Sequence, residues 1–289
     1  MRIPRRSILK GMMAGSALAA YSLPRFSFAT AAEPILPRDI MLLTAGTAGR
    51  FELGVQAAGT VGSIAFGNDL PDAGALQRLF PKVHGKRLVG LMSDAAYVLF
   101  SELARDAGVT QMFEGRHMIA VDGSSARHAL HSVPGFHGAA PALAAALVQG
   151  NAGFAITEVP LGGSGRAHCG VDWSSLGFAS YRVAGVSPQD EIWLHLSRIG
   201  IGPGCDALGV DASQAEPLRC WRSMAAPNIA PHNVAGQGWE QTLGQTLAML
   251  AAGSCNNRAP CINQAFIHQL LPHEDGTAHD SFVSFVMEA

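Results

Sequence analysis

The order of apolar and polar positions changes from strand-like to helix-like within residues 87–109. A short apolar run from Leu88 to Met92 is typical of a buried strand. Ser93 can cap a helix, and the apolar positions after it recur at helical spacing until Gly108, a residue that commonly ends helices. This segment therefore predicts a strand followed by a helix.

The rest of the pattern predicts further strands and helices. A hairpin is expected across Asp122-Gly123, a turn-forming pair between two strand-like segments. The expected elements are strands at 118–121 and 127–132, a helix at 139–149, strands at 154–159, 176–183 and 192–199, a helix at 238–252, and a final strand pair at 264–270 and 281–287. Strands separated by helices favour a layered α/β (or α+β) fold with helices packed on a β-sheet, and the hairpin makes that sheet mixed.

The first 31 residues have the pattern of a cleavable export signal. Basic residues are followed by an uncharged stretch at 11–23, and a small-residue cleavage pattern ends at Ala31. At about 1.5 Å per residue, that stretch is too short to cross a hydrocarbon layer of about 30 Å. The run RRSILK, which begins at Arg5-Arg6, resembles the twin-arginine (Tat) export signal, with Ile8 where that family usually has Phe. The resemblance covers the leader only.

The resemblance implies that the Tat translocase exports a folded chain to the periplasm, with cleavage near Ala31. Residues 32–289 are then expected to form a single globular domain, with a candidate sub-boundary in the proline- and asparagine-containing loop at 224–238. The Tat route is common for redox proteins that carry a cofactor. It also exports cargo that folds fast or assembles with a partner before export.

Composition and charge exclude several classes of protein. Hydrophobic residues make up 48% of the chain, which is enough for a core and excludes a wholly disordered protein. Without the leader the chain has 15 basic and 22 acidic residues, a net charge of −7, so we expect no binding to nucleic acid. No later stretch has 18 uninterrupted apolar residues, which predicts a soluble mature protein without a permanent membrane anchor.

The eleven histidines raise the question of a metal site, whose ligands must converge on one point. His128 and His131 would project to opposite faces of a strand at 127–132, so they cannot share a metal ion locally. His273 and His279 lie in an acidic loop that could chelate an ion or could simply be solvated. We therefore assign no metal ligand.

Five cysteines in an oxidising compartment predict disulfides and one unpaired residue. Cys255 and Cys261 enclose a short run of turn-forming residues and are the first candidate pair. Cys205 and Cys220 are the second candidate pair. Cys169 is left over, as a buried inert thiol or as a nucleophile or metal ligand.

Loops at the ends of two expected strands form the candidate ligand site. If the strands at 88–92 and 154–159 are parallel members of one sheet, the loops that follow them share an edge, where ligands collect in α/β proteins. The candidate ligand-binding residues are Ser93, Asp94, Gly162, Gly163, Ser164, Arg166 and His168. Arg166 would supply a fixed positive charge, and Asp94 or His168 could exchange a proton. Such a site would suit a small anionic or polar ligand; the alternative is a set of ordinary solvated turns.

No motif identifies a reaction or a cofactor. The glycine-rich run at 162–166 does not match the dinucleotide-binding, Walker or G-x-S-x-G patterns, and the chain has no CxxC, CxxCH or HExxH. We expect a periplasmic accessory or ligand-binding factor that serves an exported redox or metal enzyme. The alternatives are a periplasmic enzyme, either a hydrolase or a cofactor-bearing oxidoreductase, and a structural partner exported as part of a folded complex.

Overall fold

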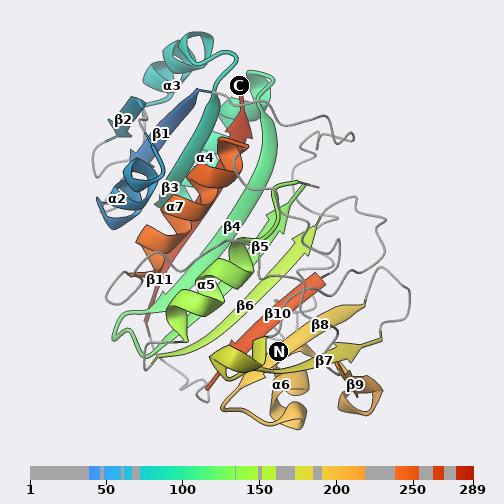
Figure 1. Cartoon of the computed structure of the whole chain (residues 1–289). Coiled ribbons are helices and arrows are strands. Elements are labelled where there is room, and N and C mark those ends of the chain that lie inside the picture. Colours follow the sequence, from blue (N-terminus) through green and yellow to red (C-terminus); the bar gives the residue numbers. More distant parts are fainter. Residues whose placement is uncertain are drawn as a thin grey trace, which may run out of the picture.

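The computed structural model describes residues 39–45, 49–59, 62–66, 72–133, 135–148, 152–160, 173–184, 191–218, 238–253, 263–269 and 278–289. The expected leader, with Arg5 and Arg6, lies outside these residues, as does nearly all of the expected sub-boundary at 224–238. The described residues form one mixed sheet of eleven strands with helices on both faces (Figure 1). The predicted layered α/β (or α+β) fold is confirmed.

The strands are β1 (Ile40–Ala45), β2 (Gly62–Phe66), β3 (Arg87–Ser93), β4 (Thr110–Ala120), β5 (Ser125–Ser132), β6 (Gly153–Pro160), β7 (Ala179–Val183), β8 (Ile192–Ser197), β9 (Ala215–Pro217), β10 (Asn263–His268) and β11 (His279–Glu288). The helices are α2 (Gly49–Ala57), α3 (Ala73–Leu79), α4 (Asp94–Asp106), α5 (Ala139–Leu147), α6 (Ile201–Leu208) and α7 (Trp239–Ala251), with short 3₁₀ turns η1 (Phe80–Lys82), η2 (Trp173–Leu176) and η4 (Ala212–Gln214). Among the described residues, no helix is long and apolar enough to cross a membrane.

The strands lie in the order β2-β1-β3-β11-β4-β5-β6-β10-β8-β7-β9. Strand β1 is parallel to β2 and β3, β5 is parallel to β6, and β8 is parallel to β10. All other neighbouring pairs are antiparallel. The sheet is therefore mixed, as predicted.

The two most local predictions are confirmed. Strand β3 runs directly into α4, and the Oγ of Ser93 accepts a hydrogen bond from the backbone N–H of Ala96 at the start of the helix. The chain leaves α4 through Gly108, whose φ of 78° suits glycine. Strands β4 and β5 form the predicted antiparallel hairpin, with Gly123 in the turn at φ 71°.

The predicted final strand pair is wrong, because β10 and β11 do not pair with each other. Strand β11 lies between β3 and β4, and β10 lies between β6 and β8. On β11, Val286 packs against α7 and its neighbours, whereas Phe285 and Met287 pack into a cluster with α4. A strand with apolar side chains on both faces belongs in the interior of a sheet that is covered on both sides.

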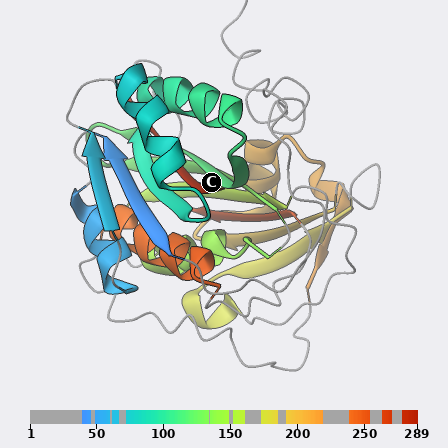
Figure 2. The same ribbon diagram turned by 90° about the horizontal axis from the view of Figure 1, so that it is seen from above.

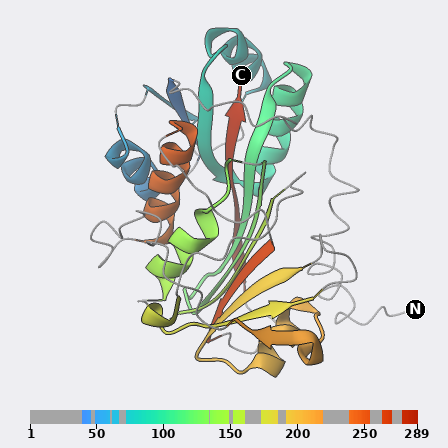
Figure 3. The same ribbon diagram turned by 45° about the vertical axis from the view of Figure 1, so that its right-hand side comes forward.

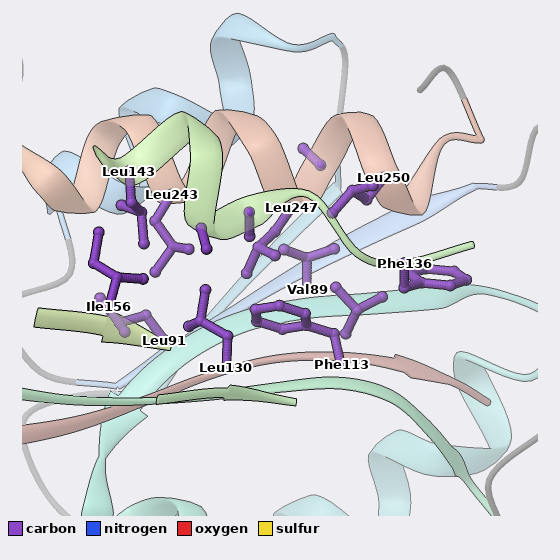
Figure 4. Packing of buried hydrophobic residues seen from close by; sticks show 14 of the residues in the cluster. Val89, Leu91, Phe113, Leu130, Phe136, Leu143, Ile156, Leu243, Leu247 and Leu250 are labelled. Atoms are coloured by element: carbon purple, nitrogen blue, oxygen red, sulfur yellow. The ribbon is translucent and has the colours of Figure 1, made fainter. Parts of the chain in front are cut away.

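Helices pack on both faces of the sheet (Figure 2). Helices α2, α5 and α7 cover one face, here called the α5/α7 face, and the largest apolar cluster lies between them and the sheet (Figure 4). The sheet contributes Val89, Leu91, Phe113, Leu130 and Ile156 to this cluster, and the helices contribute Leu143, Leu243, Leu247 and Leu250.

The opposite face, here called the α4/α6 face, has two separate apolar clusters. One lies under α3 and α4, and the other lies under α6. Between them is the middle of the face, formed by β4, β5 and β6, and no helix of the described chain covers it (Figure 3). This arrangement leaves room for polar side chains in the centre of the sheet.

Helices α2 and α7 cross at two glycines. A Cβ at Gly244 would overlap the backbone carbonyl of Phe51, and a Cβ at Gly54 would overlap the carbonyl of Gln241. The two backbones can therefore approach this closely only because neither glycine has a side chain.

Gly244→Ala is expected to lower the free energy of unfolding by about 3 kcal/mol, because a backbone atom cannot move aside as a flexible side chain can. Gly202→Ala in α6 is the matched control, since nothing lies within 4 Å of the added Cβ and alanine favours a helix. Urea unfolding of both variants measures the difference. Equal stability of Gly244→Ala and the parent chain would contradict the close α2–α7 crossing.

Candidate functional site

Ser93 and Asp94, two of the predicted ligand-binding residues, lie at the start of α4. Ser93 caps the helix, and Oδ1 of Asp94 lies 3.6 Å from Nη1 of Arg116 on β4. The other predicted residues, Gly162, Gly163, Ser164, Arg166 and His168, lie outside the described residues. The structure thus places Asp94 beside Arg116, a cation that was not among the predicted site residues.

The geometric premise of the predicted site is wrong. Strand β3 and strand β6 belong to one sheet, but the steps from β3 to β11, from β11 to β4 and from β4 to β5 are all antiparallel, and β5 is parallel to β6. Three reversals leave β3 and β6 antiparallel. The C-terminal ends of β3 and β6 therefore point in opposite directions, and the loops that follow them begin at opposite ends of the strands.

The predicted disulfide between Cys205 and Cys220 is not formed, because Cys205 is a free thiol. Its side chain is buried under α6 with Leu194, Leu196 and other apolar residues, and burial raises the pKa of the thiol. It is thus a core residue. Cys220, Cys255 and Cys261 lie outside the described residues, so the pairing of Cys255 with Cys261 stays a prediction.

A polar patch occupies the uncovered middle of the α4/α6 face. On β5, alternate residues Arg127, Ala129 and His131 point to this face. Ala129 lies between Arg116 of β4 and Thr157 of β6 in the register of the sheet. The small alanine is therefore surrounded by two arginines, a histidine and a threonine, and these five residues are here called the Ala129 patch.

A buried hydrogen-bond network fixes Arg116, one of the residues of the patch. The hydroxyl of Tyr97 on α4 lies 2.9 Å from Oε2 of Glu114 and 2.8 Å from Nε2 of Gln111. The other carboxylate oxygen of Glu114 accepts a hydrogen bond from Nε of Arg116 at 2.9 Å. Burial, with the Glu114 charge beside it, raises the pKa of Tyr97 well above its usual value, so this hydroxyl stays protonated. The network fixes Arg116 and leaves its Nη2 without an ion pair among the described residues.

Arg127 has no ion pair with any described residue, although its side chain is half-buried. Burial lowers the pKa of its guanidinium, with no neighbouring carboxylate to oppose the effect. A cation that is partly removed from water without a counter-charge costs free energy. Arg127 is thus poorly explained as a stabilising residue.

His131 is also incompletely satisfied. Its Nδ1 is buried and has no hydrogen-bond partner among the described residues. Burial lowers the pKa of the imidazole, and Arg116 lowers it further while Glu114 raises it. A neutral imidazole at pH 7 can donate one hydrogen bond and accept another. As predicted, His131 faces away from His128, which points to the opposite face of β5.

The α5/α7 face contains a chain of three hydrogen-bonded side chains from three neighbouring strands. Nε2 of His117 on β4 lies 2.8 Å from Oγ of Ser284 on β11, and its Nδ1 lies 2.8 Å from Nδ1 of His128 on β5. The ring of Trp239, the first residue of α7, covers both histidines at centroid distances of 4.9 and 5.3 Å. Gly115 leaves room for the chain, because a Cβ there would collide with Ser284.

A serine bonded to a histidine is the first part of an activated nucleophile, but here the third group is a neutral histidine instead of a carboxylate, and the serine is inaccessible. Ser284 and His117 are each 0% exposed and His128 is 2% exposed. Burial lowers the pKa of His117 and lowers that of His128 to about 3, so both imidazoles are neutral at pH 7. His117 and Ser284 were not predicted from the sequence. His117 could have been found, since it and His128 are equally far from the predicted turn at Asp122-Gly123 and so must face each other in the hairpin.

A buried carboxylate caps helix α5. The N-cap residue Gly138 has no side chain, and Oε1 of Glu158 on β6 accepts hydrogen bonds from the N–H groups of Gly138 and Ala139 at 2.7 and 3.1 Å. Burial raises the pKa of Glu158 to about 7, although these N–H groups lower it. Glu158 therefore caps α5 from β6, the strand that follows it in the chain.

A second pair of histidines lies further along the α5/α7 face. His195 on β8 bonds Ser180 through Nδ1 at 2.8 Å and stacks on Phe266, while His268 on β10 stacks on Phe154. Within the described part of the chain, no three histidine, cysteine, aspartate or glutamate side chains are grouped closely enough to hold a metal ion. These histidines are packed as neutral aromatic rings.

Comparison of the chain with protein-family models, with curated proteins and with solved structures found no match. The function must therefore be inferred from the residues themselves.

Proposed function

We propose that the chain is exported by the Tat route to the periplasm, where it binds a small polar ligand as an accessory or ligand-binding factor. The leader that begins at Arg5-Arg6 supports export, because it resembles a Tat signal. The Ala129 patch supports binding, because the middle of a sheet face flanked by two apolar clusters would ordinarily be apolar as well.

One observation carries the binding part of the proposal. Arg127 is half-buried, charged and without an ion pair among the described residues, and on the same face of β5, four residues away, the Nδ1 of His131 also lacks a partner there. Unsatisfied groups cost stability, so their retention favours a role in binding. Ionisable residues with perturbed pKa values that lie on one face of a sheet favour a ligand site.

Native mass spectrometry of the protein purified from the periplasm tests this function. We expect a bound small molecule in the parent protein and none in Ala129→Leu, because the larger side chain fills the centre of the patch. Ala179→Leu, at an exposed position on β7, is the matched control and should retain the ligand. A ligand retained by Ala129→Leu would contradict the proposed site.

The same preparation separates the alternatives. A stoichiometric metal ion or an absorbing chromophore would favour a cofactor-bearing oxidoreductase over an accessory factor. A second protein subunit without any small molecule would favour a structural partner exported as part of a folded complex.

Replacing Arg5 and Arg6 together with lysine is expected to leave unprocessed precursor in the cytoplasm, because the Tat route depends on the arginine pair. Immunoblots of cytoplasmic and periplasmic fractions measure the size and place of the product. The parent chain in cells without the Tat translocase should show the same defect. Normal processing in either case would exclude Tat export.

The Ser284–His117–His128 chain favours a second candidate function, a serine hydrolase. A fluorophosphonate probe tests it, because such probes react only with an accessible, activated serine hydroxyl. We expect no labelling of Ser284, since its side chain is fully buried. Labelling that is lost in both Ser284→Ala and His117→Asn would instead establish the hydrolase.

A further inference from the structure

The Ala129 patch consists of polar side chains around one small residue. Its centre is the methyl group of Ala129, with Arg116 on one neighbouring strand and Thr157 on the other. Arg127 and His131 lie two residues to either side along β5. With neighbouring strands about 4.8 Å apart, the Cα atoms of Arg116 and Thr157 are separated by about 10 Å, and the small side chain of Ala129 lies between them.

Two guanidinium groups and other hydrogen-bonding side chains surround this centre. Arg127 brings an unpaired guanidinium, and Arg116 keeps its Nη2 free of ion pairs with described residues while Glu114 and Asp94 hold its other nitrogens. Thr157 adds a hydroxyl, and His131 adds a neutral imidazole. Planar guanidinium groups bind carboxylate and phosphate oxygens through paired hydrogen bonds.

The acidic residues nearby do not supply the missing counter-charge. Glu114 is bonded to Tyr97, Gln111 and Arg116, and Asp94 lies against Arg116. Neither carboxylate lies within ion-pair distance of Arg127. No described carboxylate therefore neutralises Arg127.

We propose that the Ala129 patch binds the oxyanion group of a small ligand, a carboxylate or a phosphate, with Arg127 as its principal contact. This inference rests on the proposed ligand-binding function and names the chemical class of the ligand. Arg127 supplies the fixed positive charge, Arg116 and Thr157 complete the hydrogen bonds, and His131 orients the ligand from the far side.

Isothermal titration with inorganic phosphate and, separately, with succinate tests the proposal in a low-chloride buffer. We expect at least one of the two to bind the parent protein. Arg127→Met should weaken that binding about 10- to 100-fold, the effect of losing a charge-assisted hydrogen-bond pair. Arg78→Met removes an arginine from the surface, where Arg78 is 72% exposed, and should leave the affinity unchanged.

Thermal unfolding of Arg127→Met distinguishes an arginine that binds a ligand from one that stabilises the fold. Without added anion, the variant should melt at a higher temperature than the parent, because an unpaired half-buried charge has been removed. Loss of stability in Arg127→Met would show that the arginine stabilises the fold, and would overturn the proposal.

The outcomes distinguish this inference from the function on which it rests. Binding of phosphate alone or of succinate alone identifies the oxyanion, and binding of neither overturns the inference. A neutral molecule that co-purifies with the parent and is lost in Ala129→Leu would also overturn it, while the proposed ligand-binding function would stand. If Ala129→Leu changes nothing, the proposed function fails as well.

Discussion

Lowering the pH from 6.5 to 4.5 is expected to destabilise the folded chain by about 3 kcal/mol or more. His128 and His195 are buried, and burial lowers the pKa of each to about 3. Below pH 6.5 the unfolded chain binds protons at these positions and the folded chain does not, so stability falls by about 1.4 kcal/mol per histidine and pH unit. The pKa of His117 is lowered in the same direction, by burial and by His128, and adds to the loss.

Glu158 opposes this loss over part of the range. Its pKa of about 7 in the folded chain lies above that of an unfolded glutamate, so the fold prefers the protonated acid. Its contribution to stability is fully present below the unfolded pKa and is lost as the pH rises through 7. Between pH 6.5 and 4.5, protonation of Glu158 raises the free energy of unfolding by about 1.4 kcal/mol for each pH unit of acidification. This gain is half of the loss that the two histidines cause.

Urea unfolding at a series of pH values measures this balance. His195→Phe keeps the stacked ring on Phe266 but cannot be protonated, so its stability should fall less steeply in acid than that of the parent. Phe266→Leu is the control, because it weakens the packing without removing a titrating group and should lower stability equally at every pH. Parallel pH profiles for the parent and His195→Phe would contradict the role assigned to His195.

Elements with a local pattern could be predicted from the sequence. Strand β3 and helix α4 follow from the change in periodicity at Ser93, a cap whose hydrogen bond joins residues only three positions apart. The opposite directions of His128 and His131 follow from the alternation of a strand. These features depend on neighbours along the chain, which the pattern contains.

The order of strands could not be predicted in the same way. Met287 pairs with Leu88, nearly two hundred residues away, and the local sequence of neither strand predicts which strand it pairs with. The site prediction failed for this reason, because it needed β3 and β6 to be parallel. Asp94 does lie at a polar cluster, but the residues that complete it come from β4 and β5, whose position beside α4 is a property of the whole sheet.

The burial of Arg87 is a further feature that its position at the start of a strand did not reveal. Its side chain points to the α5/α7 face, and its Nη1 donates a hydrogen bond of 2.6 Å to the backbone carbonyl of Ala251, the last residue of α7. Its Nη2 lies 3.4 Å from Oε2 of Glu288, and its guanidinium lies over the ring of Phe136. A fixed cation at a helix C-terminus interacts favourably with the helix dipole.

Arg87→Met is expected to lower the free energy of unfolding by about 3 kcal/mol, because it removes the cation from a partly buried ion pair and leaves the carbonyl of Ala251 without its donor. Urea unfolding followed by circular dichroism measures the loss. Arg182→Met is the matched control, because Arg182 pairs with Glu216 at the surface and such pairs contribute at most about 1 kcal/mol. Arg87→Lys should fall between the two, since lysine keeps the charge but cannot reach both partners with a rigid fork. If Arg87→Met and Arg182→Met lose the same amount, Arg87 does not hold the end of α7 against the sheet.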